Sequence, residues 1–438
     1  MNRNEVTRRG FFKRGGAAIA AVAVGGALRA TPGRAAGAKL VFWQLPMFSP
    51  QADKIQKEQV YAYAKGAGLR EADVEFVVVS EDTYIAKLTA AIEAGTPPDL
   101  VLVADSDAAL FLGKGHLLDV TAVVDKMKKE SGGLNPACLI PGTAGGRNYG
   151  VPVGINALPF HSRVDLLEKA KLEYPKTWDA FVEACKKVQK PPFYGYGMSL
   201  GFNDDSEYNI LTVCWAFGGK VLDDKDAVVF NSKANVDAFQ LIADMVSKHK
   251  IIPQAALSWD SSGNNKAYIS EQVAFVQNAM SVWANISQNK PELAARTGLF
   301  PAPDGPAGSQ NPLVMDYLIA FKKSPNPERA AALLEHMFKP QNYERLIVET
   351  GGRFIPIYPK LFETDFWRTR PQFRHLPKMA QTGVLISHSG RMTSKMGEVI
   401  NQHVIVKGLH RVIVDGVPAE KAVADIHAQI ETIYRRPA

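Results

Sequence analysis

Polar and aromatic side chains follow three predicted strands near the start of the chain, where a ligand could be bound. Trp43 and Gln44 end the first run of strand-forming residues, Glu81 follows the second, and Asp105 and Ser106 follow the third. The carboxyl ends of parallel strands meet at one edge of a sheet, and ligands bind at that edge. A carboxylate there can accept two hydroxyl hydrogen bonds. The alternative for Asp105 is a helix N-cap, and the alternative for Trp43 is a place in the core.

Two further candidates follow from the second half of the chain. Asn278 comes after a predicted strand over residues 273–276. Trp259 lies in a polar loop, where a large aromatic side chain is uncommon and suggests a contact with a ligand or with the core. A place in the core is the alternative for Trp259.

Hydrophobic periodicity predicts that strands and helices alternate along this chain. Residues 39–43, 74–79 and 99–103 are typical of buried strands, with helices predicted over 53–67 and from Ser80 to Gly95 between them. This alternation predicts an α/β fold with a mostly parallel sheet flanked by helices. Later signals are a helix capped by Thr177, a strand over 313–321, a helix that Pro327 opens, and a C-terminal helix over 418–434.

The first 38 residues have the layout of a removable export signal. Thr7-Arg8-Arg9-Gly10-Phe11-Phe12-Lys13 is a twin-arginine motif, an apolar run of 14 residues over 15–28 follows, and Ala36-Gly37-Ala38 offers small residues for cleavage. A spanning helix needs about 20 apolar residues, so a membrane anchor is the weaker alternative. We expect a periplasmic protein whose signal is removed near Ala38. The absence of a lipobox cysteine near this site argues against a lipid anchor.

The net charge of the chain lies almost entirely in that signal. The full chain carries +7, and residues 1–38 hold seven basic residues against one acidic residue, so the remainder is near +1. This balance gives no case for nucleic acid or an acidic membrane surface as a partner. About four hundred remaining residues are too many for one core, so two lobes are expected.

No catalytic or cofactor motif was found in the sequence. It contains no P-loop, no nucleophile elbow and no zinc-binding His-Glu-x-x-His pattern, so we expect no catalytic residues, cofactor or metal. A facing pair of carboxylates, as in a glycosidase, is the enzyme alternative that the sequence leaves open. Cys138, Cys185 and Cys214 show no metal spacing, and buried free thiols are expected.

Several segments together carry a resemblance to a known family. They are Lys87 to Leu100 with its Gly95-Thr96-Pro97-Pro98-Asp99 ending, Gly115 to Val120, Tyr149 to Gly154, Pro175 to Phe181, Val273 to Trp283, and Phe300 to Pro306. In their order and spacing over residues 39–438, the chain resembles the bacterial extracellular solute-binding proteins of the sugar-binding group, the relatives of maltose-binding protein.

The resemblance implies a two-lobed clamshell that closes on a ligand. The chain would cross between lobes near 153–156, 313–318 and 353–357, giving an N-lobe of 39–153 plus 319–353 and a C-lobe of 156–312 plus 357–438. The implied ligand is a sugar or polyol, and the implied partners are the permease subunits and the ATPase of an ABC importer. A monomer and no enzymatic activity are expected.

The resemblance also adds site candidates. Trp283 falls in a segment similar to the family's ring-stacking tryptophan region, with the core as its alternative. Tyr208 has a spacing similar to a family aromatic. Asn278, Asp316, Gly352 and Arg353 fall near implied crossings. Arg353 could bind hydroxyls or an acidic sugar there, and a structural salt bridge is its equal alternative. A polyamine or peptide receptor is the remaining alternative, and it would need several acidic residues for a cation.

Overall fold

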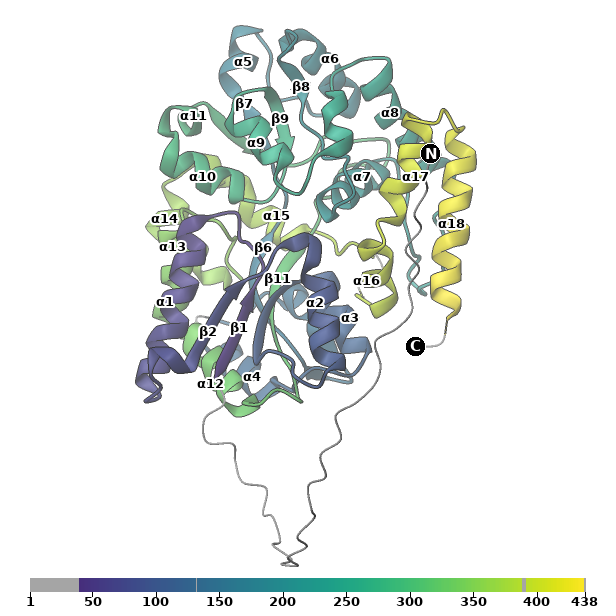
Figure 1. Cartoon of the computed structure of the whole chain (residues 1–438). Coiled ribbons are helices and arrows are strands. Elements are labelled where there is room, and N and C mark those ends of the chain that lie inside the picture. The colour runs from purple at the N-terminus through teal and green to yellow at the C-terminus, as the bar shows by residue number, and fades with distance from the viewer. Residues whose placement is uncertain (1–38, 131, 388–390, 437–438) are drawn as a thin grey trace, which may run out of the picture. The chain divides into compact units, whose positions relative to one another are not determined.

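Two β-sheets organise the described chain. The computed structural model describes residues 39–436 except 131 and 388–390, so the predicted export signal lies outside the described residues. One sheet has five strands in the order β2-β1-β3-β11-β6, and the other has four in the order β10-β7-β9-β8 (Figure 1). Each sheet is the centre of one lobe. The two-lobed α/β fold predicted from the sequence is confirmed.

The first sheet combines a local β-α-β-α-β unit with strands from later in the chain. β1 pairs in parallel with β2 and β3, as the alternation predicted, and β11 is antiparallel to both β3 and β6. Its strands are β1 (Leu40–Gln44), β2 (Val74–Val78), β3 (Leu100–Ala104), β6 (Val151–Asn156) and β11 (Val314–Ala320). Its helices are α1 (Pro50–Gly66), α2 (Glu81–Glu93), α3 (Asp105–Gly113), α4 (Thr121–Lys129), α12 (Pro327–Met337) and α13 (Pro340–Glu349), and a short hairpin of β4 (Thr143–Ala144) and β5 (Arg147–Asn148) precedes β6.

The second sheet is built from the intervening residues. β9 is parallel to β8 and antiparallel to β7, which also pairs with β10. The strands are β7 (Phe160–Arg163), β8 (Tyr194–Tyr196), β9 (Val273–Gln277) and β10 (Thr297–Phe300). The helices are α5 (Val164–Lys169), α6 (Trp178–Val188), α7 (Asp204–Ala216), α8 (Lys233–Ser247), α9 (Gly263–Ile269), α10 (Ser281–Asn289) and α11 (Pro291–Ala295). The chain therefore leaves the first sheet after β6 and returns to it at β11. The residue boundaries of the two lobes remain a prediction.

Helix starts follow from capping side chains. The Thr177 hydroxyl accepts from the Ala180 amide at 3.2 Å, so Thr177 is the N-cap of α6 as predicted. Ser49 caps α1, and Asn203 caps α7 by accepting from the Ser206 amide. Each cap satisfies a backbone donor that the helix cannot pair. The caps of α1 and α7 fix where the loops after β1 and β8 become helices.

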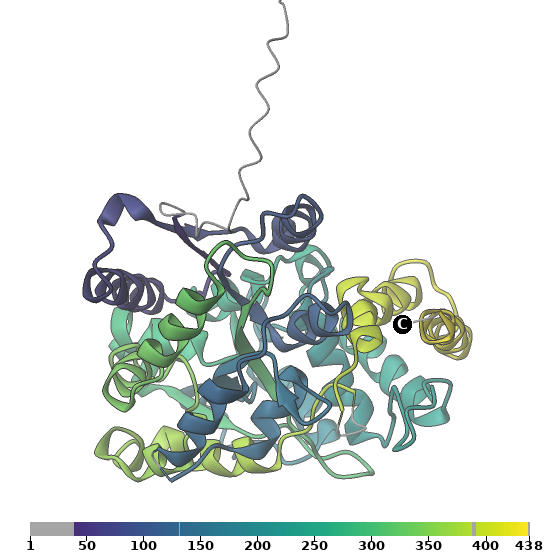
Figure 2. The same ribbon diagram turned by 90° about the horizontal axis from the view of Figure 1, so that it is seen from below.

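The C-terminal helices pack against both lobes. They are α14 (Asp365–Arg368), α15 (Leu376–Thr382), α16 (Ser394–Asn401), α17 (Val404–Ile413) and α18 (Ala419–Arg435). α17 and α18 contact each other and α8, on one side of the molecule in the view from below (Figure 2). α16 packs on α3, where a Cβ atom on Gly397 would lie 2.4 Å from the Ser106 carbonyl oxygen. Only glycine allows this approach, which brings α16 against a helix of the first lobe.

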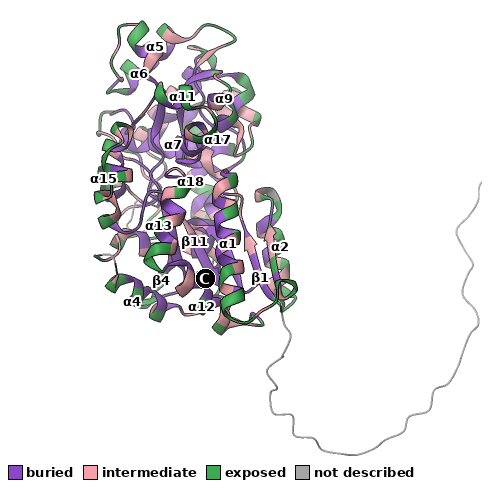
Figure 3. Cartoon of the chain, turned by 90° about the vertical axis from the view of Figure 1, so that its left-hand side faces the viewer, coloured by how far each residue is buried: buried purple, intermediate pink, exposed green. Residues whose placement is uncertain are grey.

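Buried residues, coloured purple in Figure 3, lie in the interior of both lobes, and most of them are apolar. One cluster centres on Leu40, Val103 and Ile319 of the first sheet, and another on Phe160, Phe181 and Phe275 of the second lobe. Among the helices of residues 39–130, 132–387 and 391–436, none is both long and apolar enough to cross a bilayer.

Three free thiols lie inside these cores. Cys138, Cys185 and Cys214 are all fully buried and unpaired, which confirms the sequence prediction. Burial raises the pKa of each thiol, so the reactive thiolate is disfavoured as well as shielded.

We expect none of the three thiols to react with a chromogenic aryl disulfide reagent in the native protein. All three should react after unfolding in guanidinium, and absorbance measures both stoichiometries. Rapid reaction of even one thiol under native conditions would contradict the buried placement.

Candidate functional site

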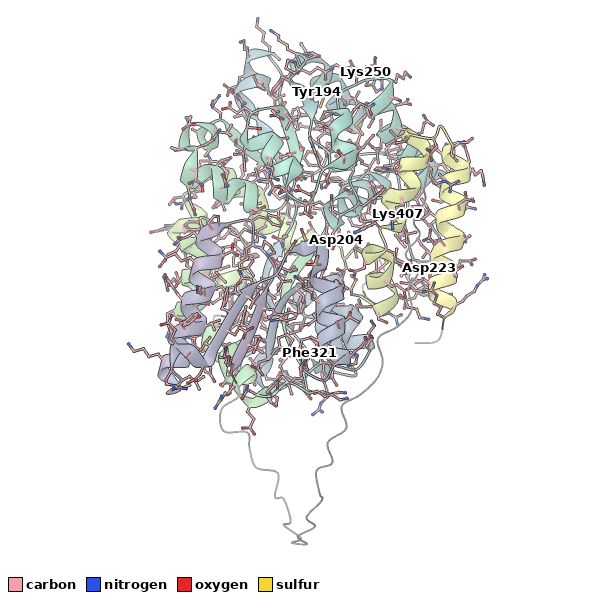
Figure 4. The ribbon with its side chains drawn as sticks, in the orientation of Figure 1. Tyr194, Asp204, Asp223, Lys250, Phe321 and Lys407 are labelled. Atoms are coloured by element: carbon pink, nitrogen blue, oxygen red, sulfur yellow. The ribbon has the colours of Figure 1, made fainter. Side chains whose placement is uncertain are left out.

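A polar cavity of about 90 Å³ lies between the two sheets. Its lining comes from both lobes, and Figure 4 marks Asp204 where the upper ends of the first-sheet strands face the second lobe. Most of the lining side chains are carboxylates, amides or hydroxyls. The lining residues are Leu45, Pro46, Phe48, Glu81, Leu102, Ala104, Asn156, Leu158, Asp204, Asp205, Tyr208, Ser261, Asn265, Asn278, Ala279, Ser281, Val314, Asp316 and Arg353.

The carboxyl edge of the first sheet forms one wall of this cavity. Leu45 follows β1, Glu81 is the first residue of α2 after β2, Ala104 ends β3, and Asn156 ends β6. Asp316 joins them from β11, which runs in the opposite direction between β3 and β6. The cavity therefore lies where a parallel sheet is expected to bind its ligand.

The second lobe contributes helix starts and strand ends. Asp204 and Asp205 open α7, whose N-terminus follows the loop after β8. Asn278 follows β9, and its side-chain amide donates to Asp205 Oδ2 at 3.0 Å and to Asn264 Oδ1 at 2.8 Å. Ser281 is the first residue of α10. These groups are positioned by strand ends and helix starts and form a polar surface.

The Arg353 guanidinium connects the segments where the two lobes meet. Its Nε donates to the Met47 carbonyl at 2.5 Å and its Nη1 donates to Asn156 Oδ1 at 2.9 Å. Its Nη2 lies 3.7 Å from Asp316 Oδ2, and the group stacks on the Phe354 ring at 4.3 Å. Arg353 is 4% exposed, so it needs all these partners to stay charged inside the protein. Arg353 forms a structural ion pair with Asp316, and it also lines the cavity.

A second cavity of about 310 Å³ adjoins the first, because five lining residues are shared. Its additional lining includes Asp107, Phe202 and His403. The two volumes together reach the size range of ordinary ligand pockets, roughly 300–1,000 Å³. In the described part of the chain, no group of three or more His, Cys, Asp or Glu residues could hold a metal ion.

Burial and the charges of neighbouring carboxylates raise the pKa of three aspartates around the two cavities. Burial, with the Glu81 charge as a further cause, raises the pKa of Asp107 and of Asp205 to about 7. The pKa of Asp204 is raised well above its ordinary value by burial and by the charges of Asp107 and Glu81. The charges come from α2 and α3 of the first lobe and α7 of the second. They therefore meet across the interface of the lobes.

Five of the residues predicted from the sequence are brought together in the cavity. They are Glu81, Tyr208, Asn278, Asp316 and Arg353. The signal was a strand end for Glu81, a strand end together with an implied crossing for Asn278, and the family resemblance for the other three.

The remaining predicted residues do not line the first cavity. Asp105 is buried and accepts from the Ser106 and Met315 amides, so it ties α3 to β11. Gln44 donates to Asp53 at 2.5 Å. The side chain of Ser106 is buried, and Trp43, although partly exposed, packs against the first-lobe core.

The two other tryptophans and Gly352 also lie outside the lining. Trp283 is 5% exposed, and its ring meets Phe373 edge-on at 5.4 Å. Trp259 contributes its backbone carbonyl, which accepts from Asn203 at 3.0 Å. Gly352 lies beside the Phe373 and Trp367 rings. These residues shape the surroundings of the cavity.

Sequence reasoning missed several lining residues. Asp204 and Asp205 carry a readable signal, since Asn203 followed by acidic residues is typical of a helix start after a strand. Phe48 carries none, because its backbone adopts a left-handed φ of 52° that the sequence around it does not predict. Asn156 and Asn265 look like ordinary polar residues until the lobes are assembled.

The fold and the cavity define a two-lobed binding protein of the α/β class. The model of the bacterial extracellular solute-binding protein family matches residues 58–375, and the chain belongs to that family. Among curated relatives, a binding protein of Brucella abortus is 23% identical over 297 residues, 67% of this chain and 71% of its own length.

Solved structures share the fold over nearly the whole described chain. The maltose-bound MalE3 of T. maritima superposes with a TM-score of 0.79 at 22% identity, covering 90% of this chain and 100% of that one. An ABC transporter solute-binding protein of Agrobacterium radiobacter K84 in complex with ribitol superposes with a TM-score of 0.78 at 16% identity, covering 91% and 99%.

We expect Arg353→Met to destabilise the protein by about 2–4 kcal/mol, because it leaves the partly buried Asp316 without its cation and removes the donors to Met47 and Asn156. Adding Asp316→Asn to that variant should recover part of the loss. Urea unfolding of the two single variants, the double variant and the parent measures the coupling. Additive losses in the double variant would contradict the ion pair.

We expect Asp107→Asn to gain stability relative to the parent as the pH rises from 5 to 8. The native pKa of Asp107 is raised to about 7, so the native state holds a proton that the unfolded state has lost, and native stability falls as the pH approaches 7. The difference should grow by of order 1 kcal/mol per pH unit below 7. Asp224→Asn, at an exposed site, is the control. Parallel pH curves for Asp107→Asn and the parent would contradict the raised pKa.

Proposed function

We propose that this protein is the exported receptor of an ABC importer and binds a sugar or polyol between its two lobes. The observation that carries the proposal is that polar side chains of both lobes converge on one cavity in a chain of the solute-binding family. Only a closed form lets a ligand contact both walls, so binding shifts the population toward that form. The closed form is what membrane subunits of an importer would recognise.

The chemistry of the lining supports a polyhydroxy ligand. Asn156, Asn265 and Asn278 offer planar amides, and Ser261 and Ser281 offer hydroxyls, all suited to fixing the orientation of hydroxyl groups. Phe48 is the aromatic side chain of the first wall, and its strained backbone is a feature that clusters at ligand sites. The maltose and ribitol of the two similar structures belong to this chemical class.

The route of export and the location are part of the same proposal. The twin-arginine motif and the following apolar run support export through the twin-arginine pathway and release into the periplasm. We further propose that the protein acts as a monomer and has no catalytic role.

Thermal unfolding of residues 39–438 against a panel of sugars, polyols, amino acids and polyamines tests the proposal. A ligand at 100 times its dissociation constant adds about 2.7 kcal/mol to stability, which raises the melting temperature measurably. A shift with a sugar or polyol is the expected result. Shifts confined to amino acids or to hydroxyl-free polyamines would contradict the proposed ligand class.

We expect Phe48→Ala to weaken binding of the panel ligand by about tenfold or more, because an apolar ring face is removed from the cavity wall. Tyr61→Ala on α1, away from the cavity, is the matched control. Isothermal titration measures both affinities, and melting temperatures check that each variant folds. Equal weakening in the two variants would contradict a ligand role for Phe48.

A further inference from the structure

The second cavity offers more space than the first. It measures about 310 Å³ against about 90 Å³, and ligand pockets usually measure roughly 300–1,000 Å³. The first cavity alone is below that range. Leu45, Ala104 and Ser261 are among the five residues that line both cavities, so the two adjoin each other between the lobes. A ligand of the first cavity therefore has room to extend into the second.

An exposed aromatic side chain lines the second cavity. Phe202 is 55% exposed, and the other strongly exposed large apolar residues of the described chain, Val78 and Val414, are not aromatic and line neither cavity. Single exposed apolar side chains are ordinary on protein surfaces. Phe202 differs from the other two because it lies on the wall of a cavity between the lobes.

The loop that carries Phe202 is fixed on both sides of this residue. A Cβ atom on Gly201 would lie 1.9 Å from the Trp259 carbonyl oxygen, so only glycine allows this contact. Asn203 donates to the same carbonyl at 3.0 Å and accepts from the Ser206 amide at 3.1 Å, which starts α7. The backbone at Phe202 is therefore held in place before a ligand binds.

Side chains of α17 support one part of the Phe202 ring. The ring centres of Phe202 and His410 lie 4.6 Å apart, and Lys407 Nζ lies 5.9 Å from the Phe202 centre. His410 is itself fixed, because its Nε2 donates to the Leu200 carbonyl at 2.5 Å. Figure 4 labels Lys407 and also Asp204, which begins α7 just after this loop. More than half of the surface of Phe202 remains exposed and can contact a ligand.

The other walls of the second cavity mix apolar and polar side chains. Ile85 and Ala86 of α2 line it from the first lobe. Asp107 of α3 and Asn401 of α16 line it as well, and the Asn401 amide donates to Asp107 at 2.9 Å. Such pockets bind through apolar contacts and fix orientation through a few polar groups. A sugar ring matches both, since its faces carry C–H groups and its rim carries hydroxyls.

Each cavity is also lined by a buried tyrosine whose hydroxyl has no partner. Tyr208 lines the first cavity and is 4% exposed, and Tyr84 lines the second and is 5% exposed. Neither hydroxyl has a hydrogen-bond partner within the described residues. An unpaired buried hydroxyl is unfavourable, and a ligand oxygen bonded to it would recover that loss. One such group at each cavity favours a ligand with oxygen atoms in both.

We propose that the ligand of this receptor has two sugar units, the first bound in the first cavity and the second stacked on Phe202 in the second cavity. This proposal rests on the proposed function and narrows its ligand class to a disaccharide. Phe202 then selects for length, because a single unit in the first cavity leaves its ring without a partner. Phe202 belongs to the second lobe and Ile85 to the first, so the second unit also contacts both lobes and stabilises closure.

Titration calorimetry at pH 7.0 with compounds of one and two units tests the proposal. Maltose, cellobiose, lactose and trehalose are compared with their components glucose and galactose, and with sorbitol. We expect at least one disaccharide to bind at least about tenfold tighter than every single-unit compound, because only a second unit contacts the Phe202 ring.

Variants at the second cavity locate the effect. Phe202→Ala should weaken binding of that disaccharide about tenfold and weaken glucose binding less, and Phe202→Tyr, which keeps a ring, should lose less than Phe202→Ala. Tyr84→Phe removes only the unpaired hydroxyl and should weaken the disaccharide roughly threefold to tenfold. Val414→Ala, at an exposed position outside both cavities, is the matched control and should bind as the parent does. Melting temperatures check that each variant folds.

The outcomes separate the two proposals. A single-unit compound that binds as tightly as every disaccharide would overturn the inference and keep the proposed function. Disaccharide binding that Phe202→Ala leaves unchanged would also overturn the inference, because the second unit would then lie elsewhere. Absence of binding by all of the compounds would overturn the proposed function and the inference with it.

Discussion

The buried guanidinium of Arg353 is the interaction on which the arrangement of the site depends. It joins the loop after β1, the end of β6 and the middle of β11, which are three segments far apart in the sequence. A buried cation is tolerated only when its donors are satisfied, so these three segments must come together for the charge to stay inside. The same constraint fixes Asn156 and Asp316 on the cavity wall. Arg353 thereby holds the region where the chain passes from one sheet to the other.

Acidic groups lie on both sides of the cavity. Glu81 and Asp107 belong to helices of the first lobe, and Asp204 and Asp205 belong to a helix of the second. Burial is the largest cause that raises the pKa of Asp107, Asp204 and Asp205, and the Glu81 charge adds to the rise in each case. Groups of both lobes line the cavity, so under the proposed function a ligand that contacts both walls stabilises the closed arrangement.

The sequence predicted the fold well because strand and helix signals are local. The alternation over residues 39–104 reappears as β1, α1, β2, α2 and β3, and the Thr177 cap is where it was expected. Long-range pairing was beyond local reasoning, as β11 shows: residues 314–320 insert between β3, which ends at residue 104, and β6, which ends at residue 156. The packing of α16 on α3, which depends on Gly397, was unreadable for the same reason.

Sequence reasoning placed residues on the cavity wall where a strand end decides the position, but not where a helix turn decides it. Asn278 directly follows β9 and lines the cavity, whereas Trp283 lies in α10 two residues beyond Ser281. Two residues along a helix rotate the side-chain direction by about 200°, so Ser281 faces the cavity while Trp283 packs on Phe373. Asp105 follows a strand end as expected, but its carboxylate accepts hydrogen bonds from two backbone amides, those of Ser106 and Met315. Such partners become visible only in three dimensions.

The most direct test of ligand-driven closure is a distance measured between spin labels on the two lobes. Thr83→Cys on α2 and Ser258→Cys beside the cavity residue Ser261 are exposed positions, and the three native thiols are buried. Pulsed electron resonance on the labelled pair, with and without the ligand found by the thermal panel, gives the distance distribution. The account predicts that saturating ligand narrows the distribution and moves it to shorter distances. An unchanged distribution at saturation would contradict binding by closure of the two lobes.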